Sequence, residues 1–205
     1  MKIQLENIGK RFNREWIFRN ISYTFSGNNK YSLLGTNGTG KSTLLQIIAG
    51  SMSQTEGKII YDLPSIKKES ESGLFSQVAF AAPYLELPEE MNWREAIVFH
   101  GRFKKFTNHL SADEIIKLSQ LELAAGKEIR NFSSGMKQRA KLTLAILSDT
   151  PLLFLDEPST NLDEKGVRWY QNLISEFAKE KMVLVCSNYN KEEYSFCNES
   201  LIISN

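Results

Sequence analysis

The sequence predicts an α/β fold with a parallel or mixed sheet that helices cover on both faces. Two observations support this class. Short apolar runs alternate with helix-like segments along most of the chain, and such alternation is typical of strands joined by helical crossovers. In addition, a glycine-rich loop separates the apolar run Tyr31–Leu34 from the helix-like segment Leu44–Ala49. A strand, loop and helix in this order form a phosphate-binding unit.

The predicted elements follow the chain in the order that this class requires. Strands are predicted at Ile3–Ile8, Trp16–Phe18, Ile21–Phe25, Lys30–Leu34, Gly57–Tyr61, Leu74–Phe80, Leu152–Leu155, Met182–Cys186 and Leu201–Ile203. Helices are predicted at Leu44–Ala49, Trp93–Phe106, Ser111–Leu123, Ser133–Leu147 and Glu164–Glu180. Ser111 and Glu114 have the spacing of a capping box, so Ser111 is expected to begin its helix. The segment from about Trp93 to Ala125 is interpreted as a helical insertion.

The composition is that of an ordinary globular domain. Of the 205 residues, 41% are hydrophobic and 24% are charged, and 25 Lys and Arg nearly balance 24 Asp and Glu. This balance argues against nucleic acid as a partner, and pairs such as Lys67-Lys68 are interpreted as solvated surface. No apolar run approaches the ~20 residues of a membrane-spanning helix, so no direct membrane insertion is expected. Cys186 and Cys197 lack metal-ligand spacing and fit free thiols in a reducing cytosol.

The glycine-rich loop is the most informative feature of the chain. Its glycines let backbone N–H groups turn toward a phosphate, and the N-terminus of the next helix favours negative charge. Lys41 is expected to place its charge on the β- and γ-phosphates, and the Ser42 hydroxyl to bind Mg²⁺. A chance glycine-rich turn is the simpler alternative, but every fixed position of the motif is present. The predicted nucleotide-binding residues are Gly35, Thr36, Asn37, Gly38, Thr39, Gly40, Lys41, Ser42 and Thr43.

A pair of carboxylates follows the apolar run Leu152–Leu155. Asp156 is expected to hold Mg²⁺, directly or through water, and Glu157 to orient and deprotonate the attacking water. By itself, an Asp-Glu pair after a strand is usually a capped loop. Behind a complete phosphate-binding loop, the pair predicts the second half of a nucleotide-hydrolysing site.

A third motif lies between these two. The stretch Phe132-Ser-Ser-Gly-Met136, with Gln138-Arg139 behind it, resembles the signature sequence of the ATP-binding-cassette (ABC) ATPases, usually written Leu-Ser-Gly-Gly-Gln. Alone, these residues would be an ordinary helix N-cap. With the other two motifs on either side, in the order of that family, the resemblance extends over about Ile3 to Ile203.

The resemblance implies a P-loop NTPase of the ABC type, with a RecA-like core, an N-terminal antiparallel β-subdomain and an inserted helical subdomain. Residues 1–205 would form a single ATP-binding domain, with the helical subdomain at about 84–135. In this family Ser133, Ser134 and Gly135 would close over the nucleotide of the opposite subunit in a head-to-tail dimer, with Asp163 at the interface. Phe12 would stack on adenine, with Trp16 as the alternative. A half-buried strand aromatic explains Phe12 equally well.

The implied function is that of the ATP-binding and ATP-hydrolysing subunit of an ABC transporter, which uses ATP and Mg²⁺. Its partners would be a transmembrane permease subunit and a second ABC ATPase subunit, with a homodimer preferred over a heterodimer. The chain would be cytoplasmic, and peripheral on the cytoplasmic face of the membrane through the permease. The alternative is a regulatory or switch ABC protein with weak hydrolysis that is not directly in transport.

Two positions depart from the family pattern. Pro83 stands where a glutamine is expected, and proline offers neither a side-chain amide nor a backbone N–H. Gln77 and Glu86 are candidates to stand in for it. Asn188 stands at the position of the switch histidine, and it can donate a neutral hydrogen bond but carries no charge. We therefore predict slow hydrolysis, with Glu157, Lys41 and Asn188 as catalytic residues.

The segment from Tyr84 to Arg94 is predicted to receive a cytoplasmic helix of the permease. Large apolar side chains that look exposed suit such docking. Packing in a helical core explains the same side chains nearly as well. The residues concerned are Tyr84, Leu85, Leu87, Met91 and Trp93.

Overall fold

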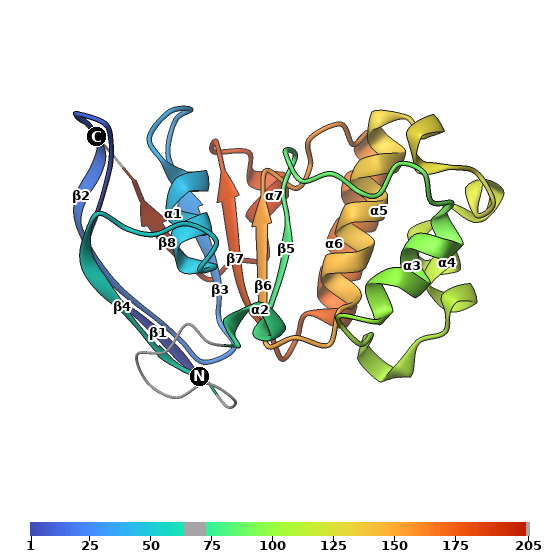
Figure 1. Cartoon of the computed structure of the whole chain (residues 1–205), viewed down its shortest axis with the longest axis horizontal. Coiled ribbons are helices and arrows are strands. Elements are labelled where there is room, and N and C mark those ends of the chain that lie inside the picture. The colour runs from blue at the N-terminus through green and yellow to red at the C-terminus, as the bar shows by residue number, and fades with distance from the viewer. Residues whose placement is uncertain (64–72, 204–205) are drawn as a thin grey trace.

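The computed structural model describes residues 1–63 and 73–203. The Lys67-Lys68 pair lies outside the described residues. The described residues form an antiparallel sheet, a parallel sheet and a helical region, which follow one another along the long axis of the molecule (Figure 1).

The antiparallel sheet has the strand order β2-β1-β4, with β1 (Lys2–Phe12) between β2 (Glu15–Ser26) and β4 (Glu56–Asp62). The sequence predicts two short strands where the structure has the single strand β2. Asn20 explains the difference, because it has a left-handed φ of 58° where the pairing with β1 changes register. This local irregularity interrupts the apolar alternation but not the strand.

The parallel sheet has the strand order β5-β6-β7-β3-β8, and all four neighbouring pairs are parallel. Its strands are β3 (Lys30–Leu34), β5 (Val78–Ala81), β6 (Leu152–Asp156), β7 (Met182–Ser187) and β8 (Glu199–Ile202). Every residue of β6 and β7 is buried. The predicted α/β class with a sheet covered on both faces is confirmed.

Two hydrophobic cores lie on the two faces of the parallel sheet. Leu152 and Phe154 of β6 pack into the core that contains α1 (Lys41–Ile48) and the antiparallel sheet. Leu153 and Leu155 point to the other face and pack with α5 (Ser134–Leu147), α6 (Glu164–Phe177) and the helical region. This alternation along a buried strand joins the three parts of the molecule into one folded unit.

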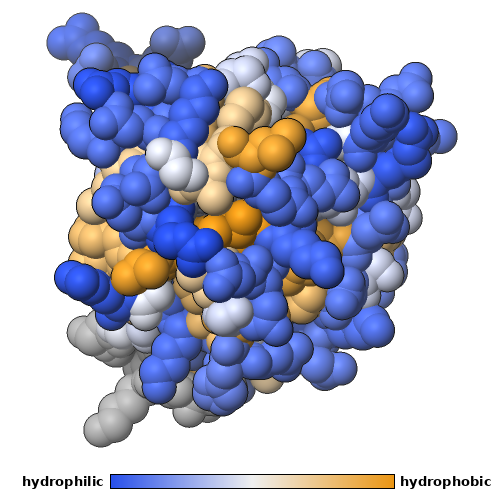
Figure 2. Space-filling model, turned by 90° about the vertical axis from the view of Figure 1, so that its right-hand side faces the viewer, coloured by the Kyte–Doolittle hydropathy of each residue, from blue (hydrophilic) through white to orange (hydrophobic). Residues whose placement is uncertain are grey.

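The helical region lies beyond α5, at the end of the molecule opposite the antiparallel sheet (Figure 1). It contains α3 (Trp93–Gly101), α4 (Ala112–Ser119) and the short 3₁₀ turns η1 (Thr107–His109), η2 (Glu122–Ala124) and η3 (Ile129–Asn131). The predicted capping box of Ser111 and Glu114 is confirmed, and Asn92 and Glu95 form a second one. Figure 2 shows this end covered mostly by hydrophilic side chains, with small separate apolar patches.

Several predicted boundaries are wrong. The predicted strand Leu74–Phe80 begins instead with the helical turn α2 (Leu74–Gln77), because Gly73 (φ 88°) starts a helix, and the strand begins only at Val78. The predicted helix Trp93–Phe106 ends at Gly101, since Phe106 forms a β-bridge with Ser148. The predicted helix Ser111–Leu123 ends at Ser119, where Gln120 turns left-handed.

At the C-terminal side, α6 ends three residues earlier than predicted, at Phe177, and the short helix α7 (Lys191–Tyr194) was not predicted. Among the described residues, helices long and apolar enough to cross a membrane are absent.

Candidate nucleotide-binding site

The carboxyl ends of the parallel strands carry the candidate site. β3 leads into the glycine-rich loop, β6 ends in Asp156, β7 leads into Asn188 and β5 leads into Pro83. In a parallel sheet these ends meet at one edge, which is where such folds bind ligands. The topology therefore brings together segments that are far apart in the sequence.

The glycine-rich loop has a backbone that only small residues allow. Gly38 and Gly40 have left-handed φ values of 87° and 91°, and Gly40 is the N-cap of α1. A Cβ atom at Gly40 would lie 2.6 Å from Ile17 Cγ2 and 2.7 Å from Phe18 Cδ1. The loop is thus packed against strand β2, and a larger residue at Gly40 would force the two apart.

Lys41 is buried at the first position of α1 and is bonded to the loop itself. Its Nζ donates hydrogen bonds to the carbonyls of Gly35 (2.9 Å) and Thr36 (3.0 Å). Thr39 Oγ1 also donates to the Thr36 carbonyl, at 3.0 Å. The ammonium group is therefore held inside the curve of the loop, where an anion would meet it.

Asp156, the last residue of β6, has a buried carboxylate that is open to a further partner. Its Oδ1 makes no hydrogen bond with the described residues. Burial raises the pKa of Asp156, and the side chain of Ser42 partly offsets this shift. A buried oxygen without a partner is costly, and oxygen ligands of this kind suit Mg²⁺. Ser42 and Asp156 therefore fit a magnesium ion.

Glu157 follows directly and has an unusual backbone. Its φ is 43°, in the left-handed region, and its N–H donates to the carbonyl of Cys186 at 3.0 Å. This bond to the end of β7 fixes the position of the residue. Its side chain lines the same cavity as the glycine-rich loop.

That cavity, of about 340 Å³, unites the two halves of the predicted site. It also includes Ile17, to which no sequence motif points; the pleat of β2 places Ile17 on the face opposite Trp16. Its lining residues are Ile17, Asn37, Gly38, Gly40, Lys41, Ser42, Thr43 and Glu157.

The two aromatic candidates for adenine stacking do not line this cavity. Phe12 is 44% exposed at the end of β1, with the Lys10 ammonium 4.9 Å from its ring centre. The ring of Trp16 has the guanidinium groups of Arg11 and Arg19 at 5.3 Å and 4.1 Å.

The signature residues lie apart from the glycine-rich loop. Ser133 is the N-cap of α5, and its Oγ accepts a hydrogen bond from Met136 N–H at 3.3 Å. A Cβ atom at Gly135 would lie 2.9 Å from the carbonyl of Asn161, so this end of α5 packs on the loop after β6. Neither Ser133, Ser134 nor Gly135 lines the cavity of Lys41 and Glu157.

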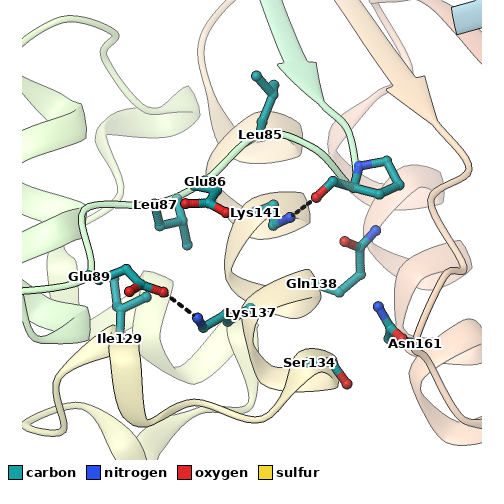
Figure 3. Close-up of a pocket in the computed structure, with 11 residues that line it drawn as sticks. Leu85, Glu86, Leu87, Glu89, Ile129, Ser134, Lys137, Gln138, Lys141 and Asn161 are labelled. Carbon is teal, nitrogen blue, oxygen red and sulfur yellow. Dashed lines mark hydrogen bonds and ion pairs between the residues drawn. The ribbon is translucent and has the colours of Figure 1, made fainter.

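One face of α5 connects the signature helix to the other motifs. Lys141 donates to the Pro83 carbonyl at 2.8 Å, Lys137 pairs with Glu89 at 2.5 Å, and Gln138 donates to the Pro158 carbonyl at 2.9 Å. Figure 3 shows these side chains pointing toward the segment after β5 and toward Asn161. α5 is therefore attached both to the segment after β5 and to the loop after β6.

Asn188 is exposed directly after β7 and does not line the cavity of Lys41. The next residue, Tyr189, has a left-handed φ of 59°. Ser187 Oγ accepts a hydrogen bond from Asn190 N–H at 3.1 Å, which closes this turn. Glu193 of α7, to which no sequence motif points, is buried and bonded to the loop after β6.

An apolar groove of about 400 Å³ lies between β5 and α3. Phe75, Phe103 and Leu85 are exposed along it, whereas Leu87 and Met91 pack against the core. Trp93 is fully buried, and its Nε1 donates to Ser119 Oγ at 3.1 Å. The prediction that Trp93 is exposed for docking is therefore wrong; its helical position turns it into the core.

Comparisons with known proteins agree with this fold. The family model described as ABC transporter matches residues 18–160. An uncharacterized ABC transporter ATP-binding protein of Bacillus subtilis, YybJ, is 28% identical over 97% of this chain and 91% of its own length. The Nod factor export ATP-binding protein I of Rhizobium johnstonii is 28% identical over 98% of this chain, which spans 66% of that protein.

A solved structure of an ABC cassette, a dimer in a post-hydrolysis state with ADP and Pi, has a TM-score of 0.81. It is 22% identical and covers 98% of this chain and 94% of its own. Fold and loop geometry together define a P-loop nucleotide-binding protein. The chain belongs to the ABC transporter family, as an ATP-binding protein of the ATPase type. The predicted family and fold are confirmed.

Proposed function

We propose that this chain binds and hydrolyses ATP to power a separate transmembrane permease. One observation carries the proposal: Lys41 and Glu157 line one cavity, whereas the signature residues Ser133 to Gly135 lie outside it. Because the signature segment of the same chain is outside the cavity, we infer that a second copy of the chain supplies this segment to the site. Residues 1–205 act as a single ATP-binding domain, with the helical subdomain at about 84–135.

The glycine-rich loop and the two carboxylates have separate roles in this proposal. The backbone from Gly35 to Thr43 encloses the phosphates, and Lys41 neutralises their charge. Ser42 and Asp156 hold Mg²⁺, which supplies charge stabilisation on the phosphate oxygens. Glu157 orients and deprotonates the attacking water.

Ser133, Ser134 and Gly135 act on the nucleotide of the partner subunit. The exposed N-terminus of α5 offers backbone N–H groups and a favourable dipole to an anion. ATP thereby draws two subunits together, and hydrolysis lets them separate. We propose a homodimer, and we assign Phe12 to the adenine ring.

Hydrolysis is slow in this proposal. Pro83 has no side-chain amide that could bind the metal, and the neutral amide of Asn188 offers no positive charge to the γ-phosphate. Loss of one preorganised donor costs ~2.7–4 kcal/mol at a transition state, and the amide of Asn188 restores part of this.

The apolar groove between β5 and α3 receives a short cytoplasmic helix of the permease. Its exposed phenylalanines suit the apolar face of such a helix, and the Lys104 ammonium at the groove favours an acidic residue on it. This contact places the chain on the cytoplasmic face of the membrane.

The test is steady-state phosphate release by the purified chain and its Glu157→Gln variant, with Glu164→Gln, an exposed residue of α6, as the matched control. We expect Glu157→Gln to be roughly 10²-fold slower and the control to equal the wild type. Equal rates for all three proteins, also with the permease present, would mean that the chain binds ATP without hydrolysing it.

A further inference from the structure

The segment after β5 presents a tyrosine to the site in place of the missing glutamine. Leu85 N–H donates to the Ala82 carbonyl at 3.2 Å, which closes a turn with Pro83 and Tyr84 at its two central positions. Proline favours the first central position of such turns. Pro83 therefore lacks the side-chain amide of a glutamine, and the turn that it favours directs Tyr84 back toward the edge of the sheet.

The turn brings Tyr84 to the metal side of the site. Ala81 of β5 pairs with Leu155 of β6, so the turn starts level with Asp156. The Tyr84 hydroxyl lies next to the side chains of Asp156 and Gln46 of α1. Tyr84 and Gln46 also line one cavity, of about 330 Å³.

Lys141 of the signature helix holds this turn in place. Its Nζ donates to the carbonyls of Ala82 (3.3 Å) and Pro83 (2.8 Å). Figure 3 shows the Lys141 ammonium at the segment after β5. The position of Tyr84 is therefore set from α5 as well as from β5.

The residues considered as substitutes for the glutamine lie elsewhere. Gln77 precedes β5, at the amino end of the strand, and its Nε2 donates to Ser76 Oγ at 3.1 Å. Glu86 lines the cavity on the other side of the turn, next to Lys141. Tyr84 is the side chain of this segment that reaches Asp156.

We propose that Tyr84 is a positioning residue for the metal-bound nucleotide, acting through its hydroxyl on the carboxylate of Asp156. Asp156 Oδ1 has no hydrogen-bond partner among the described residues, and a phenol donor beside this carboxylate orients it toward a cation. The inference rests on the proposed function, because it requires MgATP in this site.

The experiment measures the affinity of the whole chain for a fluorescent ATP analogue, with Mg²⁺ and with EDTA. Tyr84→Phe removes the hydroxyl and keeps the ring. We expect its affinity with Mg²⁺ to fall about three- to tenfold, the effect of one lost hydrogen bond to a charged, partly exposed group. With EDTA its affinity should equal that of the wild type.

Tyr23→Phe is the matched control. The Tyr23 hydroxyl likewise lies beside a carboxylate, donating to Glu199 at 3.1 Å, but Tyr23 is on the antiparallel sheet. Tyr23→Phe should bind the ATP analogue as tightly as the wild type does, both with Mg²⁺ and with EDTA. Lys141→Met, which releases the turn, should weaken binding only with Mg²⁺, and adding it to Tyr84→Phe should have little further effect.

Three outcomes would overturn the inference. Unchanged affinity of Tyr84→Phe with Mg²⁺ would leave the proposed function intact and remove the role of Tyr84. An equal loss with Mg²⁺ and EDTA would assign Tyr84 to the nucleotide or the fold, not to the metal. A wild type that binds no tighter with Mg²⁺ would remove both the inference and the proposed metal site.

Discussion

The carboxylate of Glu193 accepts a hydrogen bond from the Ser159 hydroxyl at 2.7 Å and another from the Ser159 N–H at 3.2 Å. Asn190 Nδ2 donates to the same hydroxyl at 3.1 Å. The loop after β6 and the segment after β7 are thus joined through one buried acid. Asn188 and Glu157, both proposed to be catalytic, lie on these two segments.

Glu193→Gln should change how stability depends on pH. Burial raises the pKa of Glu193 above the usual glutamate value of 4.5, and Glu157 adds to the rise. As pH increases past 4.5, Glu193 ionises first in the unfolded chain. The free energy of unfolding of the wild type therefore falls until the pH exceeds the pKa of Glu193 in the folded chain. Glutamine does not ionise, so the melting temperature of the variant relative to wild type should rise over this range.

The measurement is thermal unfolding from pH 4 to pH 8, with Glu192→Gln, an exposed neighbour, as the control. The difference in melting temperature between Glu192→Gln and the wild type should stay constant with pH. If the difference in melting temperature between Glu193→Gln and the wild type is also constant, the pKa of Glu193 does not change on folding.

Ser133→Ala should prevent ATP-dependent dimerisation and leave ATP binding by the single chain unchanged. Ser133 lies outside the cavity that contains Lys41, and in the proposed function its hydroxyl acts on the partner's nucleotide. The variant also loses an N-cap, at a cost of ~1 kcal/mol. Light scattering of the Glu157→Gln background at saturating ATP gives the oligomeric state.

Ser111→Ala separates the two effects. Ser111 is the N-cap of α4 and loses a comparable capping bond. It should still dimerise. Equal dimerisation of both variants would contradict a role of the signature segment in the interface.

Trp93→Phe should destabilise the chain without weakening ATP binding. The indole leaves a cavity, and Ser119 Oγ loses its donor; together these cost about 2–4 kcal/mol. The melting temperature should fall by roughly 5–15 °C. Ser119→Ala, which removes the hydrogen bond alone, should have the smaller effect. A fall in ATP affinity in either folded variant would mean that the helical region contributes to the nucleotide site.

Phe103→Glu should disrupt coupling to the permease but keep basal ATP hydrolysis. Phe103 is 64% exposed and packs edge-to-face on Phe99, at 5.1 Å between ring centres, along the apolar groove. A carboxylate there opposes insertion of an apolar helix face. Stimulation by permease-containing membranes should be lost.

Leu123→Glu is the matched control, because Leu123 is fully exposed and does not line the groove. It should retain stimulation. If both variants are stimulated equally, the groove is not the docking site.

The sequence predicts the fold and the nucleotide-binding loop because both depend on local signals. Gly40, Lys41 and Asp156 stand at fixed places relative to a strand or a helix, so their neighbours in the chain determine their geometry. The two faces of β6 likewise follow from its unbroken apolar run.

Contacts between distant segments could not be predicted in this way. Ile17 reaches the cavity only because of the register of β2, which shifts near Asn20. Tyr84 reaches Asp156 because a turn and Lys141 of α5 hold it there. Trp93 looks like a docking residue in the sequence, and only the packing of α3 against α4 buries it.

The left-handed backbone of Glu157 lowers the stability of the fold, whereas the proposed hydrolysis requires the side chain at this position. A residue with a side chain pays ~1–3 kcal/mol for such a conformation, and glycine would avoid that cost. Libraries screened for heat resistance alone should therefore accumulate glycine at position 157. Under the role proposed for Glu157, the variants most resistant to heat would then have lost ATP hydrolysis.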